Sequence, residues 1–100
     1  MDRLAALEAF TRVVADGSFT AAAEALGRTR AAVSRQVQML EAHVGGRLLN
    51  RTTRRVSLTE AGRAYYETAR RVLGDLAEAE AGIAQLTDEP RGTLRIDAPM

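Results

Sequence analysis

Apolar residues recur at helical spacing at the start of the chain and predict two helices there. Between residues 2 and 15 they return every three or four positions on one side of a helix: Leu4, Leu7, Phe10, Val13 and Val14. Asp2 can cap the start of this helix, and Gly17 can end it. A second, shorter helix is predicted next, with Ser18 or Thr20 as its N-cap, and it should bury Phe19, Ala22, Ala23 and Leu26.

The spacing predicts a third helix that starts after Thr29 and ends near residue 44, because Gly27 stops the helix before it. Its apolar stripe should face the first two helices and consists of Val33, Val37, Leu40 and Val44. At about 100° per residue, the opposite face carries Ala31, Arg35, Gln38 and Ala42, with Ser34 on its flank. Two helices joined by a tight turn, with arginine on the outward face of the second, are typical of a DNA-binding helix-turn-helix.

Two short runs of apolar and β-branched residues follow the Gly45–Gly46 pair and flank a polar, basic turn. The first run is Leu48–Leu49 and the second is Val56–Leu58, so the pattern predicts a small β-hairpin, or wing. The tip of the wing would present arginines at positions 51, 54 and 55.

From Thr59 to about Asp88, apolar positions alternate in steps of four and three, which is a heptad seam: Tyr65, Ala69, Val72, Leu76, Ala79, Ile83 and Leu86. Thr59 can cap this helix, and Glu60 is favourable in its first turn. At a rise of 1.5 Å per residue such a helix is about 45 Å long. A seam of this length needs a partner, most simply a second copy of the chain. The alternative is that the seam packs only on its own domain.

Composition excludes several classes of protein. The chain has 100 residues, which is room for one domain, and it has no Cys and one His, so a disulfide framework and a Cys- or His-based metal site are excluded. No apolar run could span a membrane and no signal peptide is present, so a cytoplasmic location is expected. Ser34 and His43 lie nine residues apart on one predicted helix and cannot pair as nucleophile and base. We therefore expect no enzyme, no catalytic or metal-binding residue and no cofactor in this chain.

Positive charge gathers in the middle of the chain, although the net charge is only +1. Residues 27–63 contain eight Arg and two acidic residues, a net of +6, whereas residues 1–26 carry −2 and residues 64–100 carry −3. Every cation is arginine, whose forked guanidinium suits phosphate oxygens and guanine edges. Such segregation is typical of a polyanion-binding face, and the alternative is a basic surface that is merely solvated.

In order and spacing, these motifs resemble the N-terminal part of bacterial LysR-type transcriptional regulators. The resemblance covers nearly the whole chain and is carried by residues 17–19, 33–37, 58–62 and 90–96. It implies a mainly α fold: a winged helix-turn-helix of three helices and a β-hairpin at 1–58, then a coiled-coil linker helix at 59–88. Arg30 and Leu49 depart from the family pattern, which commonly has Gln and Phe there.

The resemblance also implies that residues 89–100 are a hinge and the first strand of an effector-binding domain outside the chain. An unpaired strand is unstable, which supports this expectation. That domain would bind a small-molecule inducer. The linker helix would form an antiparallel homodimer, and full-length members are usually tetramers on DNA.

Double-stranded DNA is therefore the expected partner, and no membrane is expected. Arg30 and Arg35 are the first choices for guanine edges, and the full set on the third helix is Thr29, Arg30, Ala31, Ser34, Arg35 and Gln38. The set on the wing is Arg51, Thr53, Arg54 and Arg55. A dimer would bind an interrupted inverted repeat. The alternative function is a coiled-coil dimerisation module without DNA specificity of its own.

Overall fold

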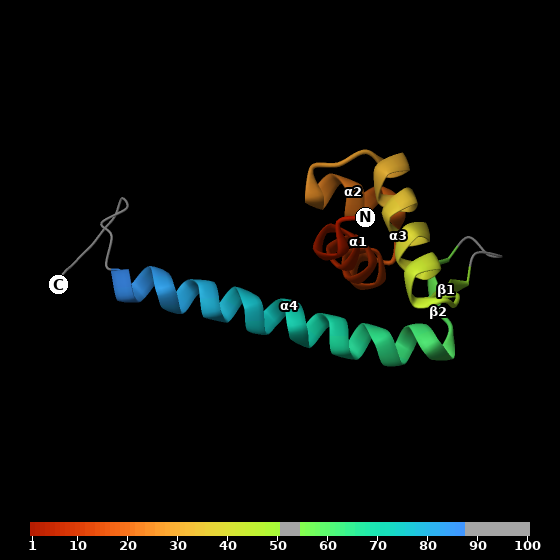
Figure 1. Cartoon of the computed structure of the whole chain (residues 1–100). Coiled ribbons are helices and arrows are strands. Elements are labelled where there is room, and N and C mark those ends of the chain that lie inside the picture. Colours follow the sequence, from red (N-terminus) through yellow and green to blue (C-terminus); the bar gives the residue numbers. More distant parts are fainter. Residues whose placement is uncertain (51–54, 88–100) are drawn as a thin grey trace. The chain divides into compact units, whose positions relative to one another are not determined.

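The computed structural model describes residues 1–50 and 55–87 of the chain. Its elements are α1 (Arg3–Asp16), α2 (Phe19–Leu26), α3 (Arg30–Val44), β1 (Leu49–Asn50), β2 (Ser57–Leu58) and α4 (Glu60–Thr87) (Figure 1). The predicted order of three helices, a hairpin and a long helix is confirmed. The chain divides into two compact units, residues 1–70 and 71–100, and each is described by itself.

Polar caps begin the helices at the predicted positions. Each cap accepts a hydrogen bond of 2.9–3.1 Å from the N–H three residues later, and the caps are Asp2, Ser18, Thr29 and Thr59. Ser18, rather than Thr20, is thus the N-cap of α2. The first three helices end in the left-handed conformation at Gly17, Gly27 and Gly45.

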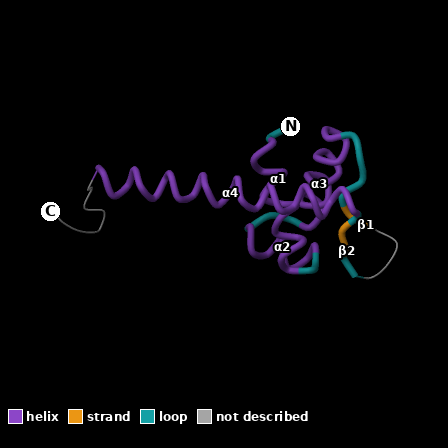
Figure 2. The backbone as a smooth tube through the Cα atoms, turned by 90° about the horizontal axis from the view of Figure 1, so that it is seen from below, coloured by secondary structure: helices purple, strands orange, loops and turns teal. Residues whose placement is uncertain are grey.

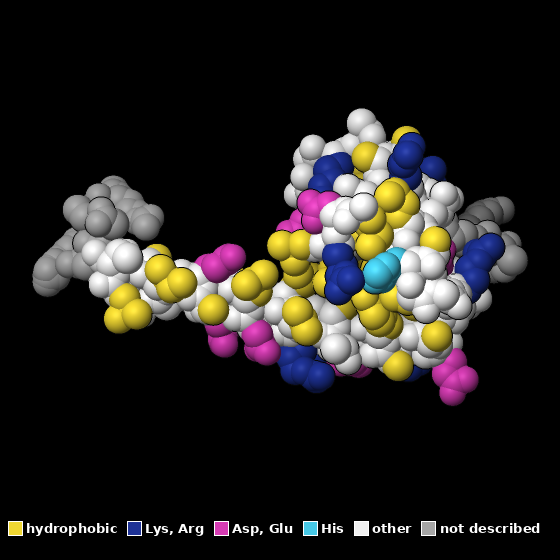
Figure 3. Space-filling model, viewed as in Figure 1, with side chains coloured by type: hydrophobic (Ala, Val, Ile, Leu, Met, Phe, Trp, Pro, Cys, Tyr) yellow, Lys and Arg dark blue, Asp and Glu magenta, His cyan; other side chains and the backbone are white. Residues whose placement is uncertain are grey.

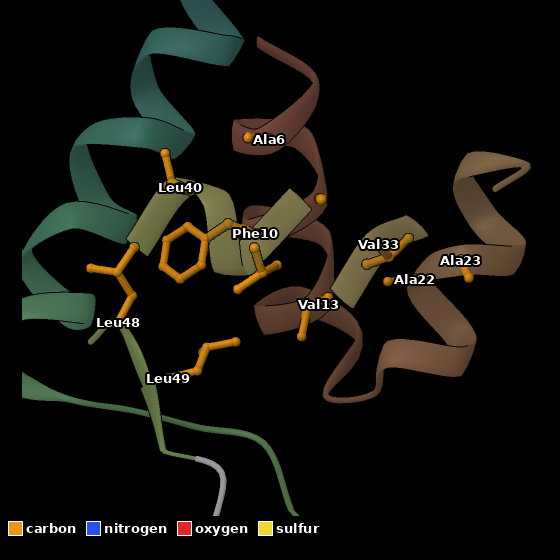
Figure 4. Packing of buried hydrophobic residues seen from close by; sticks show 11 residues of the cluster. Ala6, Phe10, Val13, Ala22, Ala23, Val33, Leu40, Leu48 and Leu49 are labelled. Atoms are coloured by element: carbon orange, nitrogen blue, oxygen red, sulfur yellow. The ribbon is translucent and has the colours of Figure 1, made fainter. Parts of the chain in front are cut away.

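The core of the first unit is centred on Phe10, between α1 and α3 (Figure 4). It consists of residues that are at most 4% exposed: Ala6, Ala9, Phe10, Val13, Ala22, Ala23, Val33, Val37, Leu40, Leu48 and Leu49. Two rings from α4 also pack on Phe10, Tyr65 at 5.9 Å and Tyr66 at 6.2 Å between ring centroids, in tilted and edge-on arrangements. The first turns of α4 therefore belong to this unit.

Several residues of the predicted apolar stripes lie outside this core. Val44 is 39% exposed, and its predicted packing on α1 and α2 was wrong because it is the last residue of α3 before Gly45 turns the chain. Leu4, near the start of α1, is 42% exposed. Phe19 and Leu26 are only partly buried at the edge of the core.

The two strands pair antiparallel and form the base of the predicted wing (Figure 2). Leu49 is opposite Leu58, and Asn50 is opposite Ser57. Leu49 is fully buried, so this side of the hairpin rests on the core. The tip residues Arg51, Thr53 and Arg54 lie outside the described residues.

The first residues of the predicted heptad seam of α4 pack within the first unit, whereas the later ones are exposed. In the first unit, the Tyr65 ring packs on Phe10, and Ala69 is buried, with 3% of its surface exposed. In the second unit, apolar side chains follow one another along the helix (Figure 3), and the remaining seam residues are exposed: Val72, Leu76, Ala79, Ile83 and Leu86. Dimerisation through them stays a prediction. Within residues 1–50 and 55–87, no helix is long and apolar enough to cross a membrane.

Candidate nucleic-acid interface

The outward face of α3 is defined by the burial of its inward face. Val33, Val37 and Leu40 are fully buried, which turns the opposite side of the helix to solvent. That side carries the predicted residues Ala31, Arg35, Gln38 and Ala42, all exposed, with Ser34 half-buried on the flank. The predicted division of α3 into two faces is confirmed except at Val44.

Five of the six residues predicted on α3 line one open depression of the surface, which we call the α3 depression. Its lining consists of Arg30, Ala31, Ala32, Ser34, Arg35 and Gln38. Two guanidinium groups, an amide and a hydroxyl supply hydrogen-bond donors, while the alanines leave room between them. Such a set can bind the oxygen and nitrogen acceptors of base edges and phosphates.

Arg30 and Thr29 mark the end of this surface nearest α2. The Arg30 guanidinium carbon lies 5.7 Å from the centre of the Phe19 ring, a cation–π contact that ties the side chain to α2. Thr29 is the sixth predicted residue and does not line the depression. Its Oγ1 accepts from the Ala32 N–H at 3.0 Å, so its first role is to cap α3.

The turn between α2 and α3 is closed by main-chain hydrogen bonds. Gly27 N–H donates to the Glu24 oxygen at 3.2 Å, and Arg28 N–H donates to the Ala23 oxygen at 2.9 Å. With Gly27 at φ 68°, this is a Schellman cap. The cap determines where α3 begins relative to α2.

The arginines of the basic middle segment do not all face solvent. Five of those in the described residues are exposed: Arg30, Arg35, Arg47, Arg55 and Arg63. Arg28 instead pairs with Glu8, Nη2 to Oε1 at 2.6 Å, and its side chain is 23% exposed. The charge count from the sequence therefore overstates the positive charge at the surface. Sequence reasoning missed this pairing because Glu8 lies twenty residues away.

Buried Glu41 joins α3 to the wing. Its Oε2 accepts from the N–H groups of Leu48 at 2.9 Å and Leu49 at 3.1 Å. Thr59 adds two further bonds to this segment, from its N–H to the Leu48 oxygen at 3.0 Å and from its hydroxyl to the Arg47 oxygen at 2.7 Å. From the sequence, Glu41 was noted only beside Leu40 as part of the family resemblance and was given no structural role; its acceptor role depends on how the segment after Gly46 packs on α3.

A family model described as "Bacterial regulatory helix-turn-helix protein, lysR family" matches residues 4–63. The chain belongs to the LysR family. The predicted resemblance and the predicted winged helix-turn-helix followed by a long helix are thus confirmed.

Two relatives in the LysR family illustrate the match in sequence. An HTH-type transcriptional regulator of Xanthomonas campestris is 52% identical over 90 residues, which cover 90% of this chain and 26% of the relative. The HTH-type transcriptional regulator CrgA of Neisseria meningitidis is 47% identical over 94 residues, covering 94% of this chain and 31% of the relative. The chain therefore spans about a quarter to a third of the length of these relatives.

Solved LysR-family structures share the fold. The crystal structure of the BenM_DBD/catB site 1 DNA complex matches with a TM-score of 0.82 and 32% identity, covering 89% of this chain and 98% of that chain. The structure of CrgA, a LysR-type transcriptional regulator from Neisseria meningitidis, matches with a TM-score of 0.67 and 48% identity, covering 79% of this chain and 27% of that chain.

Proposed function

We propose that this chain is the DNA-binding part of a LysR-type transcriptional regulator and binds the major groove of a double-stranded site through α3. The observation that carries the proposal is the α3 depression, in which Arg35 and Gln38 stand on the side opposite a fully buried stripe and Arg30 stands in the first turn of the helix. The likeness to a fold solved in complex with DNA supports the same function.

The specific contacts come from the arginines of the depression. Arg30 and Arg35 each donate paired hydrogen bonds to guanine O6 and N7, worth about 1–3 kcal/mol of discrimination against a wrong base. Gln38 bonds a base edge or a phosphate, and Ala31 contacts a thymine methyl group. Sequence preference therefore comes from the middle and the first turn of α3.

Other residues hold the helix on the DNA backbone without selecting a sequence. Ser34 and Thr29 donate their hydroxyl protons to phosphate oxygens, and the positive end of the α3 dipole favours the same anions. The wing residues follow the backbone or enter a neighbouring narrow minor groove: Arg51, Thr53, Arg54 and Arg55. These contacts determine most of the salt dependence of binding.

The proposal includes a homodimer through α4. The exposed apolar positions from Val72 to Leu86 supply the contact, and two α3 helices then face an interrupted inverted repeat. In the whole protein, which we place in the cytoplasm, a small-molecule inducer binds outside these residues, and dimers join into a tetramer. No enzymatic role is proposed for the chain.

Selection of bound duplexes from a random-sequence pool tests the proposal. The full chain should enrich an interrupted inverted repeat. Its affinity for that duplex should fall with salt, with a log–log slope of about −0.9 for each phosphate contacted. Enrichment of no sequence by a dimeric chain would instead favour the second candidate, a dimerisation module without DNA specificity, to which the exposed seam of α4 points.

A further inference from the structure

The guanidinium of Arg28 lies between α1 and α3 and joins them. Its Nη2 donates to Glu8 Oε1 at 2.6 Å, and its Nη1 donates to the main-chain oxygen of Ala5 at 3.1 Å and to Gln36 Oε1 at 3.0 Å. Ala5 and Glu8 belong to α1, whereas Gln36 belongs to α3. One side chain from the α2–α3 turn thus connects the two helices that build most of the core.

This contact lies at the flank of the α3 depression, about 100° around the helix axis from Arg35. Gln36 follows Arg35 directly, and successive residues of a helix are about 100° apart around its axis. Gln36 is half-buried and does not line the depression, whereas Arg35 is exposed and does. Arg28 does not line the depression either, so its guanidinium is engaged with α1 and Gln36 beside the surface that the proposed function uses.

The surroundings of Arg28 also disfavour a phosphate as its partner. A charge-assisted bond of 2.6 Å to a carboxylate is short, and Glu8 would repel an approaching phosphate. The two remaining acceptors already use both protons of Nη1, so acceptors of the folded chain use three of the five guanidinium protons. A phosphate would compete with these acceptors beside a carboxylate that repels it.

We infer that Arg28 is a positioning residue for DNA binding: its guanidinium holds α3 against α1 so that Arg30 and Arg35 enter the groove in one orientation. The inference rests on the proposed function and adds to it a residue that makes no contact with DNA. Arg28 directly precedes Thr29, the N-cap of α3, so a fixed Arg28 also fixes the start of that helix. Specific binding needs this orientation, whereas non-specific attraction to phosphates does not.

The experiment compares the unsubstituted full chain with Arg28→Met, Arg35→Met and Arg12→Met. Each protein is titrated with a duplex selected from the random pool and with a shuffled duplex of the same composition. The titrations cover several salt concentrations, at a temperature where circular dichroism shows every protein to be folded. Methionine keeps the apolar stem of arginine and removes its donors. Arg12 is the matched control, because it pairs with Asp16 on its own helix at 3.1 Å.

Arg28→Met should weaken binding to the selected duplex by about tenfold, a typical coupling between contacting residues, and leave binding to the shuffled duplex unchanged. Its salt slope should equal that of the unsubstituted chain. Arg35→Met should make the slope shallower by about 0.9, and Arg12→Met should change neither quantity. Glu8→Gln should reproduce part of the Arg28→Met effect, and the double variant should bind no more weakly than Arg28→Met alone.

Three results in Arg28→Met would overturn the inference and leave the proposed function standing. They are a salt slope shallower by about 0.9, an equal loss of affinity for both duplexes, or no loss of affinity for either. If Arg28→Met does not fold, Glu8→Gln, which keeps the side-chain volume, decides the question with the same readouts. A failure of the unsubstituted chain to distinguish the two duplexes would refute the proposed function, and the inference with it.

Discussion

Gly62 of α4 lies directly against the main chain of Leu48. A β-carbon at position 62 would be 2.8 Å from the Leu48 carbonyl carbon and closer still to its oxygen. That oxygen cannot easily retreat, because it accepts the Thr59 N–H at 3.0 Å. Glycine at this position therefore allows the start of α4 to lie beside the segment that leads into β1.

Gly62→Ala should lower the free energy of unfolding by about 3 kcal/mol, at the upper end of overpacking effects, because the added methyl group meets main chain rather than a movable side chain. Urea unfolding followed by circular dichroism measures the change. Gly74→Ala is the matched control in the same helix, since nothing lies within 4 Å of its β-carbon position. The control should be stabilised by about 0.5–1 kcal/mol, and equal effects of the two substitutions would contradict the close contact.

Glu41→Leu should destabilise the first unit by about 2–4 kcal/mol, because two buried N–H groups lose their acceptor. Glu41→Gln keeps an acceptor oxygen and should cost less. Hydrogen exchange should show faster exchange of the Leu48 and Leu49 amides in Glu41→Leu. Glu67→Gln, at an exposed ion pair, is the control and should have little effect. Unchanged exchange at both leucines would show that Glu41 does not hold the wing.

Arg35→Ala should weaken binding to the selected duplex by about 1–3 kcal/mol and relax the preference at one base pair. The reason is the loss of a donor pair from the outward face of α3. Binding titrations against every single-base variant of the duplex give both quantities. Arg70→Ala serves as the control, because Arg70 pairs with Glu67 on its own helix at 3.1 Å. Parent-like binding by Arg35→Ala would mean that another surface contacts the bases.

Leu76→Asp should convert dimers into monomers, because a carboxylate would be buried without a partner in the apolar contact between two copies. Leu76 is 39% exposed in the single chain and lies in the middle of the seam. Sedimentation over a range of concentrations measures the change. Ala81→Asp, on the opposite side of α4, should leave the dimer intact. A dimer that persists in Leu76→Asp would exclude the seam as its interface.

Features that depend on neighbouring residues were predictable from the sequence. The caps Asp2, Thr29 and Thr59 bond main-chain groups three residues away, so residue type and spacing were sufficient to identify them. The outward face of α3 followed from the periodicity of its buried stripe in the same way. For the same reason, the helix limits Arg30–Val44 agree with the prediction.

Features that depend on how elements pack were not predictable. Arg28 counted toward a basic surface, but its acceptors Glu8 and Gln36 come close only once α1 and α3 have packed. The contact of Gly62 with Leu48 likewise needs the hairpin and α4 in place. Tyr66 stood outside the predicted seam, yet its ring packs on Phe10 beside that of Tyr65.

Two separate sets of Arg28 contacts depend on the length of the turn between α2 and α3. Through its amide, Arg28 completes the cap of α2, and through its guanidinium it reaches acceptors on α1 and α3. An insertion or deletion between Gly27 and Thr29 would preserve at most one of these bonds. A change in the length of this connection should therefore separate the end of α2 from the contacts that Arg28 makes with α1 and α3.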